Sequence, residues 1–436
     1  MTITLRQAGL ALTDPAAYTD EPSLYEALAL LRHKDPVHWC AAPGYRPFWA
    51  ITRHADIREI EHRHDVFLNS PRAMLMSSAR DRTTQWTRRL LGLNMLVQMD
   101  GPRHLAFRKI SADWFRPKMM HQLEADIASL ARHHIDALIG PGEDIGFTGF
   151  RGFTGDFAQH PAARFPLAVL LSMLGLPQGD SPRLLSLTQQ LLGTDDPEQQ
   201  RNAGPFAQPA VLFDLFTYFR KIARDRRAHP TDDLASVIAN ARIDGRPLSW
   251  GDTLSYYAVI STGGHDTTSA GIAGGLLALA RHPEQLRLLR SQPDLLPLAA
   301  QEMIRVTAPF KGFMRTAARD YELHGTTIRQ GDAVFLSYVS ANHDEAVFDE
   351  PETFDATRNP NPHLSFGHGV HACLGARLAH MEICAFYAEL LPRIRTIEVI
   401  GAPRLIATTF TGGFKSLPVR LTRNDPVGPL SGEEHR

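Results

Sequence analysis

The sequence predicts a mainly α-helical fold with a minor β region. In eight segments of the chain, apolar side chains recur at the spacing of one helix face. Strand-like segments are few and short. Residues 348–364 are rich in Pro and Asn and too polar for a core strand or helix, so we expect an irregular segment there.

The elements follow in order along the chain. Helices are expected at residues 24–34, 116–138, 163–174, 213–226, 233–242, 253–280, 298–307 and 374–390. Strands are expected at residues 37–40, 48–51, 322–323, 333–338 and 419–421. No internal repeat or low-complexity tract interrupts this pattern. We therefore expect residues 1–423 to form one domain and residues 424–436, with two prolines and two glycines, to form a loosely held tail.

The composition argues against several classes of protein. A net charge of -1 and a pI of about 7.1 give no overall field that favours nucleic acid or an acidic membrane. The three cysteines, Cys40, Cys373 and Cys384, are too few for a disulfide framework and form no C-x-x-C pair. Residues 253–280 are long enough to span a bilayer, but Asp266 near their middle would cost about 2.5–3.5 kcal/mol there. We therefore expect a cytoplasmic protein with no signal peptide and no membrane anchor.

The most informative segment runs from Phe366 to Gly375, FGHGVHACLG. Its paired glycines suit a tight turn that approaches another group closely. Apolar residues of one helix face follow, so Cys373 is expected where a loop enters a helix N-terminus, a position that favours thiolate over thiol. The alternative is a small buried cysteine, which is our interpretation of Cys40 and Cys384. A thiolate is the ligand a haem iron needs to favour O–O cleavage.

A second motif, GGHDTT at residues 263–268, lies midway along the apolar helix. Two adjacent glycines weaken a helix interior by about 1 kcal/mol each, so packing alone argues against them. Thr267 follows Gly263 by four residues, so its hydroxyl can bond that carbonyl or turn to a ligand. Asp266 could relay protons beside it. On these six residues alone, a kinked core helix with a satisfied threonine remains equally open.

Together the two motifs resemble the cytochrome P-450 family, and the resemblance extends over residues 15–423. It implies a triangular helical domain around a buried haem b, with Cys373 as axial iron ligand and Phe366, Gly367 and Gly264 close to the haem. It also assigns proton delivery to Asp266 and Thr267. Within the family the chain resembles in particular the bacterial terpineol-hydroxylating branch. This likeness lies in residues 256–258, 264–268, 308–309, 311, 313–317, 403–405 and 407–408.

The resemblance also assigns charged side chains. His104 and Arg108, four apart on one helix face, together with Arg315 and His371, are expected to bind the haem propionates. The alternative for these cations is solvated surface charge. Glu302 and Arg305, three apart, are expected to join Arg358 in a structural triad rather than form a routine surface pair. His62, His64, His133 and His134 have no metal-ligand context and are expected to be exposed.

The substrate pocket is the least determined part of the site. By resemblance its wall should draw on Val259, Gly263, Phe310, Phe313, Phe410 and Thr411, together with residues 73–97. A mostly apolar lining implies a small hydrophobic substrate, with a monoterpenoid or alkyl-aromatic as the first expectation. Lys311 is expected to reach water, or alternatively to pair with a substrate carboxylate. Two departures from the family pattern are Gly263, where Ala is common, and His343, where Arg is common.

The resemblance implies hydroxylation of an unactivated C–H bond with O2. The chain has no room for a flavin or ferredoxin module, so electrons should pass from NAD(P)H through a ferredoxin reductase and a two-iron two-sulfur ferredoxin. Arg103, Lys109, Arg116 and Lys118 are candidates for the docking face of a monomer, with solvated surface as an equal alternative. Rival functions are a haem-thiolate sensor, and a peroxide-driven or rearranging enzyme. The Asp266–Thr267 pair argues against both.

Overall fold

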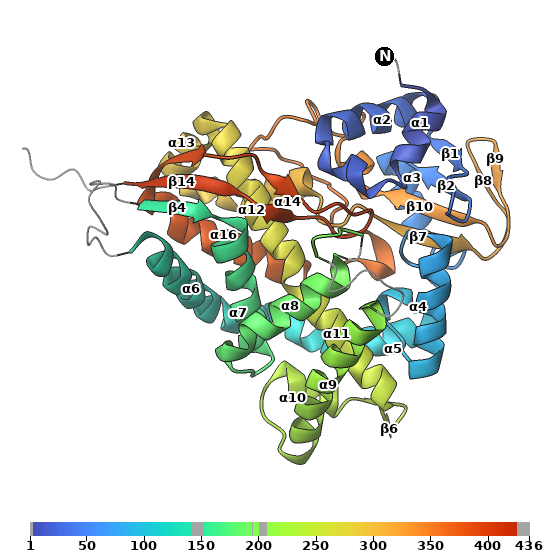
Figure 1. Cartoon of the computed structure of the whole chain (residues 1–436), viewed down its shortest axis with the longest axis horizontal. Coiled ribbons are helices and arrows are strands. Elements are labelled where there is room, and N and C mark those ends of the chain that lie inside the picture. The colour runs from blue at the N-terminus through green and yellow to red at the C-terminus, as the bar shows by residue number, and fades with distance from the viewer. Residues whose placement is uncertain (1–2, 141–151, 194, 200–206, 425–436) are drawn as a thin grey trace, which may run out of the picture.

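The computed structural model describes residues 3–140, 152–193, 195–199 and 207–424. Helices fill most of the molecule, and the largest sheet lies at one side beside the N-terminal helices α1 (Leu5–Ala11) and α2 (Glu21–Lys34) (Figure 1). The longer helices after these are α3 (His54–His62), α4 (Ser78–Leu91), α5 (Gly101–Ala112), α6 (Pro117–Ile139), α7 (Ala163–Met173), α8 (Ser181–Leu192), α9 (Ala207–Ala228), α11 (Trp250–Gly264), α12 (Asp266–Arg281), α13 (Pro283–Ser291), α14 (Leu296–Thr307) and α16 (Ala376–Leu390). The mainly helical class with a small β region is confirmed.

Shorter elements complete the chain. They are α1 (Leu5–Ala11), α10 (Leu234–Ala239), α15 (Tyr338–Asn342) and, among the single turns, the 3₁₀ turn η7 (Gly369–His371). Helix α2 covers Glu21–Lys34. Residues 348–364 form neither helix nor strand, as predicted. Of the expected tail only Asn424 lies within the described residues, where its backbone N–H donates to the Arg393 carbonyl.

The five-stranded sheet has the order β1-β2-β10-β7-β3. Its strands are β1 (Val37–Cys40), β2 (Phe48–Ile51), β10 (Ala333–Ser337), β7 (Gly312–Ala317) and β3 (Phe67–Leu68). The central strand β10 is buried along its whole length, which explains its continuous apolar run AVFL. In the antiparallel pair β10–β7, Val334 lies opposite Arg315. This register fixes a predicted propionate-binding arginine within the sheet.

The remaining strands form small sheets. β11 (Ile394–Val399), β14 (Pro418–Arg423) and β4 (Gly152–Asp156) make a three-stranded sheet in that order of pairing. Three two-stranded pairs are β5 (Arg242–Ile243) with β6 (Arg246–Pro247), β8 (Tyr321–Leu323) with β9 (Thr326–Ile328), and β12 (Arg404–Leu405) with β13 (Phe414–Ser416). The predicted helix over residues 233–242 is therefore too long, because Arg242 turns into the β5–β6 hairpin.

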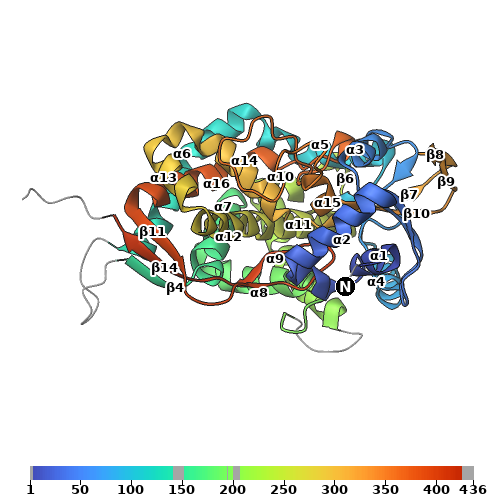
Figure 2. The same cartoon turned by 90° about the horizontal axis from the view of Figure 1, so that it is seen from above.

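The expected helix over residues 253–280 is two helices, not one. α11 ends at Gly264 and α12 begins at Asp266, and His265 between them leaves the helical region with φ −133° and ψ −43°. The poor helix propensity of two adjacent glycines explains why the chain breaks here. The pair runs through the middle of the molecule (Figure 2), and α12 packs against α7, α14 and α16.

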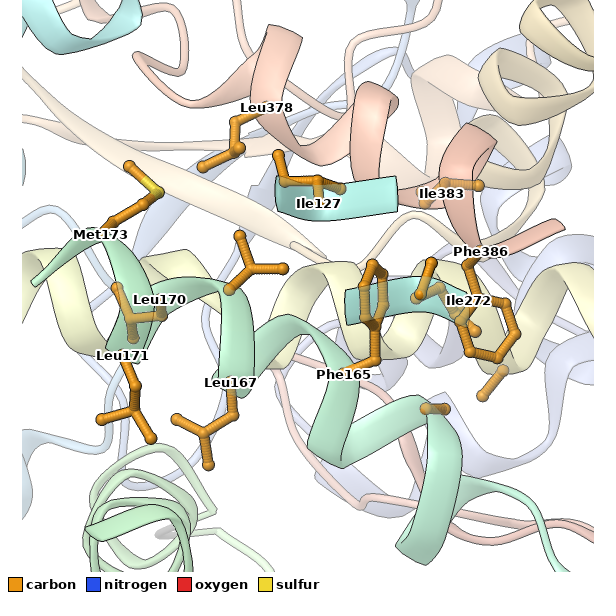
Figure 3. Close-up of a cluster of buried hydrophobic side chains, with 14 of the residues drawn as sticks. Ile127, Phe165, Leu167, Leu170, Leu171, Met173, Ile272, Leu378, Ile383 and Phe386 are labelled. Atoms are coloured by element: carbon orange, nitrogen blue, oxygen red, sulfur yellow. The ribbon is translucent and has the colours of Figure 1, made fainter. Parts of the chain in front are cut away.

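The core around these helices is a continuous apolar cluster (Figure 3). Every residue of α7 except Arg164 and Ser172 is buried, so this helix is apolar on all sides. Phe165 of α7 stacks at a tilted angle on Phe386 of α16, with ring centroids 5.5 Å apart. Gly271 brings α12 close to α16, since a Cβ there would lie 3.0 Å from Ile383. This packing fixes the start of α12 relative to the start of α16, where both motifs lie.

No helix among the described residues is long and apolar enough to cross a membrane.

Candidate active site

The loop that carries Cys373 is held against helix α3. Gly367 and Gly369 have φ of 66° and 70°, in the left-handed region that glycine adopts freely. A Cβ on Gly369 would lie 2.8 Å from the Glu61 carbonyl oxygen at the end of α3, so this position has room for glycine alone. The Cys373 N–H donates to the Phe366 carbonyl at 2.8 Å, which closes the turn. Helix α16 begins three residues later, at Ala376 rather than at the predicted residue 374.

Cys373 opens into space inside the protein. Its side chain is exposed, yet burial within the chain raises the pKa of its thiol, while the Gly375 N–H and the charge of Arg108 lower that pKa. The predicted preference for a thiolate at the helix terminus is thus opposed by burial of the charge. A cation bound at the sulfur would reverse this balance, since a coordinating thiol is deprotonated outright. A thiol that borders an interior space and has a positive charge nearby suits a metal ligand.

Open space also borders the junction of α11 and α12. Nothing lies within 4 Å of the position that a Cβ on Gly263 would occupy, although the flanking helices are buried. The Thr267 hydroxyl donates back to the Gly263 carbonyl at 3.2 Å. Of the two predicted arrangements, this is the one in which the hydroxyl bonds the helix backbone rather than a ligand. A Cβ on Gly264 would instead lie 3.2 Å from Leu170 of α7. Close helix packing thus accounts for Gly264, and its proximity to a cofactor stays a prediction.

The predicted propionate-binding side chains of α5 and the cysteine loop meet. The rings of His104 and His371 lie 4.0 Å apart between centroids. Burial, His371 and Arg108 together lower the pKa of His104 to about 4, so His104 is neutral at pH 7. The Arg108 guanidinium has no hydrogen-bond or ion-pair partner among the described residues. An unpaired, half-buried arginine beside Cys373 and two histidines fits an anionic group.

Arg315 has a protein partner that sequence reasoning missed. Its Nη2 donates to Glu61 Oε1 at 2.9 Å, and both side chains are buried. The Tyr338 hydroxyl donates to the same oxygen, while Glu61 Oε2 has no hydrogen-bond partner. Burial raises the pKa of the Glu61 carboxyl, against the opposing effect of Arg315. The available signal was Glu61 itself, a charged residue beside Ile60 on the buried face of α3.

The predicted structural triad is confirmed. Arg305 donates from Nε and Nη2 to the two carboxylate oxygens of Glu302, each at 2.7 Å, and both side chains are fully buried. Arg358 Nε donates to Glu302 Oε1 at 3.1 Å from the irregular segment. The Glu302–Arg305 pair therefore lies in the core and not on the surface, and Arg358 joins it to residues 348–364.

Three of the predicted pocket residues pack together. The rings of Phe310, Phe313 and Phe410 lie 5.1, 5.2 and 5.3 Å apart between centroids. Thr411 pairs with Phe310 through an isolated β-bridge, and its buried hydroxyl has no hydrogen-bond partner. Val259 lies on α11, one helical turn before Gly263, and is partly exposed. These positions give an aromatic wall with one unpaired hydroxyl.

Lys311 lies beside this wall and is partly exposed. Its ammonium donates to the Thr307 carbonyl at 3.4 Å, and burial lowers its pKa. His343, the second departure from the family pattern, is buried and stacks on Tyr25 with centroids 4.1 Å apart. Burial lowers the pKa of His343 to about 3, so it serves as an uncharged packing residue.

The other histidines and surface cations behave mostly as predicted. His62, His64 and His133 are exposed, but His134 is half-buried with Nδ1 bonded to the Leu130 carbonyl, which corrects one prediction. Among the described residues no group of three His, Cys, Asp or Glu could hold a metal ion. All four candidate docking residues are exposed, and two of them have ion-pair partners: Arg103 with Asp252 and Arg116 with Asp113.

Comparison with known proteins agrees with this geometry. The family model described as Cytochrome P450 matches residues 211–399, which include both motifs. Cytochrome P450-terp of a Pseudomonas species is 38% identical over 94% of this chain and 96% of its own length. A Steroid C26-monooxygenase of Mycolicibacterium smegmatis is 33% identical over 91% of this chain and 90% of its own.

Solved structures show the same architecture over nearly the whole chain. The crystal structure of CYP108D1 from Novosphingobium aromaticivorans has a TM-score of 0.86 and 38% identity, and covers 97% of this chain and 100% of that one. Mycobacterium marinum cytochrome P450 CYP268A2, solved in complex with pseudoionone, has a TM-score of 0.81 and 32% identity, with 91% and 94% coverage. With this identity and coverage, the chain belongs to the cytochrome P450 family of haem-thiolate monooxygenases.

Proposed function

We propose that this monooxygenase inserts one oxygen atom of O2 into a C–H bond of a small hydrophobic substrate, with a monoterpenoid or alkyl-aromatic as its natural class. The observation that carries the proposal is the placement of Cys373. Its thiol is accessible although it lies deep in the protein, and the nearby Arg108 has no hydrogen-bond or ion-pair partner among the described residues. Nothing in ordinary packing requires this combination.

Residues on one side of the space fit haem b. Cys373 would bind the iron, and Phe366 and Gly367 would shape the loop around it. Arg108, with the neighbouring His104 and His371, would hold a propionate. A thiolate-bound haem supplies the electron density that favours O–O cleavage. Arg315 can join a propionate only by sharing its guanidinium with Glu61, which already accepts from it at 2.9 Å.

The junction of α11 and α12 would deliver protons to the reaction. Two protons must reach oxygen for each turnover, and the apolar core excludes water that would otherwise carry them. We assign this to the Asp266 carboxyl and the Thr267 hydroxyl, which are adjacent at the start of α12. The Thr267 hydroxyl donates to the Gly263 carbonyl at 3.2 Å, which is longer than a usual O–H···O bond, so little is lost when it turns toward a ligand.

The aromatic wall supports the substrate class. Phe310, Phe313 and Phe410 present apolar faces, and Gly263 leaves room where a methyl group would otherwise stand. A relative called Cytochrome P450-terp and a structural neighbour in complex with pseudoionone point to the same class. The unpaired Thr411 hydroxyl offers a polar handle for an alcohol or ketone, and the Lys311 ammonium is a second, weaker candidate.

The remaining assignments complete the proposal. Residues 1–423 act as one domain in a cytoplasmic monomer. Electrons come from NAD(P)H through a ferredoxin reductase and a two-iron two-sulfur ferredoxin, which docks near Lys109 and Lys118. The peroxide-driven, rearranging and sensing alternatives do not need the Asp266–Thr267 pair.

The test is a substrate panel. Terpenoids, alkyl-aromatics and a steroid are titrated against the haem-loaded protein while the haem absorption band is recorded. Ligands that bind are then incubated with NAD(P)H, ferredoxin, reductase and O2. We expect micromolar binding and one hydroxylated product from a terpenoid or alkyl-aromatic. Binding of the steroid alone would refute the substrate class, and product formed only with added peroxide would refute the ferredoxin-driven reaction.

A further inference from the structure

His265, at the break between α11 and α12, is a histidine that packing alone does not explain. Its side chain is fully buried among apolar helices. Its Nε2 lies 2.9 Å from the Thr188 hydroxyl on α8, so a polar contact joins this helix to the break between α11 and α12. Burying an imidazole in this position costs free energy unless its nitrogens have partners.

The other side of the ring faces Asp266. His265 Nδ1 lies 3.1 Å from Asp266 Oδ1. The contact is too poorly aligned to satisfy the ring nitrogen, and Asp266 Oδ2 is buried with no hydrogen-bond partner. Two adjacent buried polar atoms without partners are rare in a resting core and are typical of groups that act during function. Thr188, His265 and Asp266 thus form a polar chain that ends at an unpaired carboxylate oxygen next to Thr267.

The contact between His265 and Asp266 favours one arrangement of protons. The Thr188 hydroxyl lies 2.9 Å from His265 Nε2 and 3.1 Å from the Leu184 and Leu185 carbonyls, so its single proton has alternative acceptors. If Thr188 donates to Nε2, the ring proton sits on Nδ1 and faces the carboxylate. The opposite tautomer would set a nitrogen lone pair against a carboxylate oxygen at 3.1 Å.

We propose that His265 is a positioning residue that holds the Asp266 carboxylate for proton transfer, with its own ring fixed by Thr188. The inference rests on the proposed function and adds to it a pair of residues from the break and from α8. Because the ring is held from α8, the carboxylate is positioned by a helix outside the α11–α12 pair.

The test compares four variants as haem-loaded enzymes. His265→Phe keeps an aromatic ring and removes both nitrogens, His265→Asn restores an N–H near the position of Nδ1, and Thr188→Val replaces the hydroxyl with a methyl group. Ser261→Ala is the matched control, because Ser261 is a fully buried α11 residue whose hydroxyl bonds back to Tyr257 at 2.8 Å. Product and hydrogen peroxide per NAD(P)H are measured at saturating substrate.

We expect His265→Phe to lower product per NAD(P)H about tenfold, with peroxide rising to match, since a positioned acid–base group is worth about 10²–10⁴ in rate. His265→Asn should recover part of this loss. Thr188→Val should lower product per NAD(P)H about threefold, and Ser261→Ala should give the same product per NAD(P)H as the parent. A merely structural histidine would lower haem content and leave coupling unchanged. Parent-like coupling in His265→Phe would overturn the proposal.

A second readout does not use turnover. In the reduced, carbon monoxide-bound protein labelled with ¹⁵N-histidine, the signal missing from His265→Phe identifies His265. We expect that signal to show a proton on Nδ1, and both Asp266→Asn and Thr188→Val to shift it. A proton on Nε2, or no response to Asp266→Asn, would overturn the inference. A parent that hydroxylates nothing but shows these shifts would refute the proposed function and leave the His265–Asp266 contact established.

Discussion

Removal of Glu302 should destabilise the fold more than loss of any surface charge. The Glu302 carboxylate accepts from Arg305 at two positions, from Arg358 and Asn361, and from the Asp355 backbone N–H. Glu302→Ala leaves the fully buried Arg305 guanidinium without its counter-charge. The loss of one partner of a buried pair costs about 3–5 kcal/mol, against a total stability of about 5–15 kcal/mol.

Part of the Arg305 hydrogen bonding survives in this variant. Its Nη1 still donates to the Asn342 and Pro351 carbonyls, each at 2.7 Å. We therefore expect the free energy of unfolding to fall by about 4 kcal/mol, which is a thousandfold shift of the equilibrium toward the unfolded state. Urea unfolding followed by circular dichroism measures this loss, and haem content should fall with it. Asp65→Ala, which breaks an exposed pair with Arg319, is the control and should cost less than 1 kcal/mol. Equal urea midpoints for Glu302→Ala and Asp65→Ala would refute the reasoning.

Three further predictions test other parts of the structure. Burial raises the pKa of the Glu382 carboxyl well above its ordinary 4.5. Above pH 4.5 the folded chain therefore keeps a proton that the unfolded chain releases. The free energy of unfolding should fall as pH rises from about 4.5 toward the pKa of the folded state. Glu382→Gln should remove this decline in urea unfolding at several pH values; an unchanged slope would contradict the protonated state. Gly369→Ala should lower haem retention, measured by haem transfer to apomyoglobin, because its Cβ would collide with the Glu61 carbonyl. Gly44→Ala is the control, since Gly44 has a φ of 80° but open space around it, so this variant has the backbone strain without the collision. Gly263→Ala should keep or raise thermal stability and weaken binding of the bulkiest substrates, and an unchanged binding order would show that this space does not hold substrate.

Sequence reasoning succeeded where the signal is local. Apolar periodicity located α6, α7 and α14 to within two residues at each end, because one buried face repeats along each helix. The Glu302–Arg305 pair was assigned to the core through the family resemblance, because two charges three residues apart would by themselves indicate a routine surface pair. Residues 348–364 could be identified as irregular from composition alone.

Contacts between distant segments could not be predicted this way. Glu61 and Arg315 are 254 residues apart, and Thr188 and His265 are 77 apart, so no periodicity links them. The break at His265 was not located, although a kinked helix was considered, because the apolar pattern continues on both sides of residues 263–268. The state of the Cys373 thiol depends on how deeply the loop is buried, which spacing does not reveal.

The most direct test of the account is the ligand at Cys373. The reduced protein is exposed to carbon monoxide and its absorption is compared with that of Cys373→His, which leaves the loop glycines and Arg108 intact. The parent should show the red-shifted band of thiolate-ligated haem, and the variant should bind haem, lose that band and lose all hydroxylation. A band that survives in Cys373→His would show that another residue binds the iron.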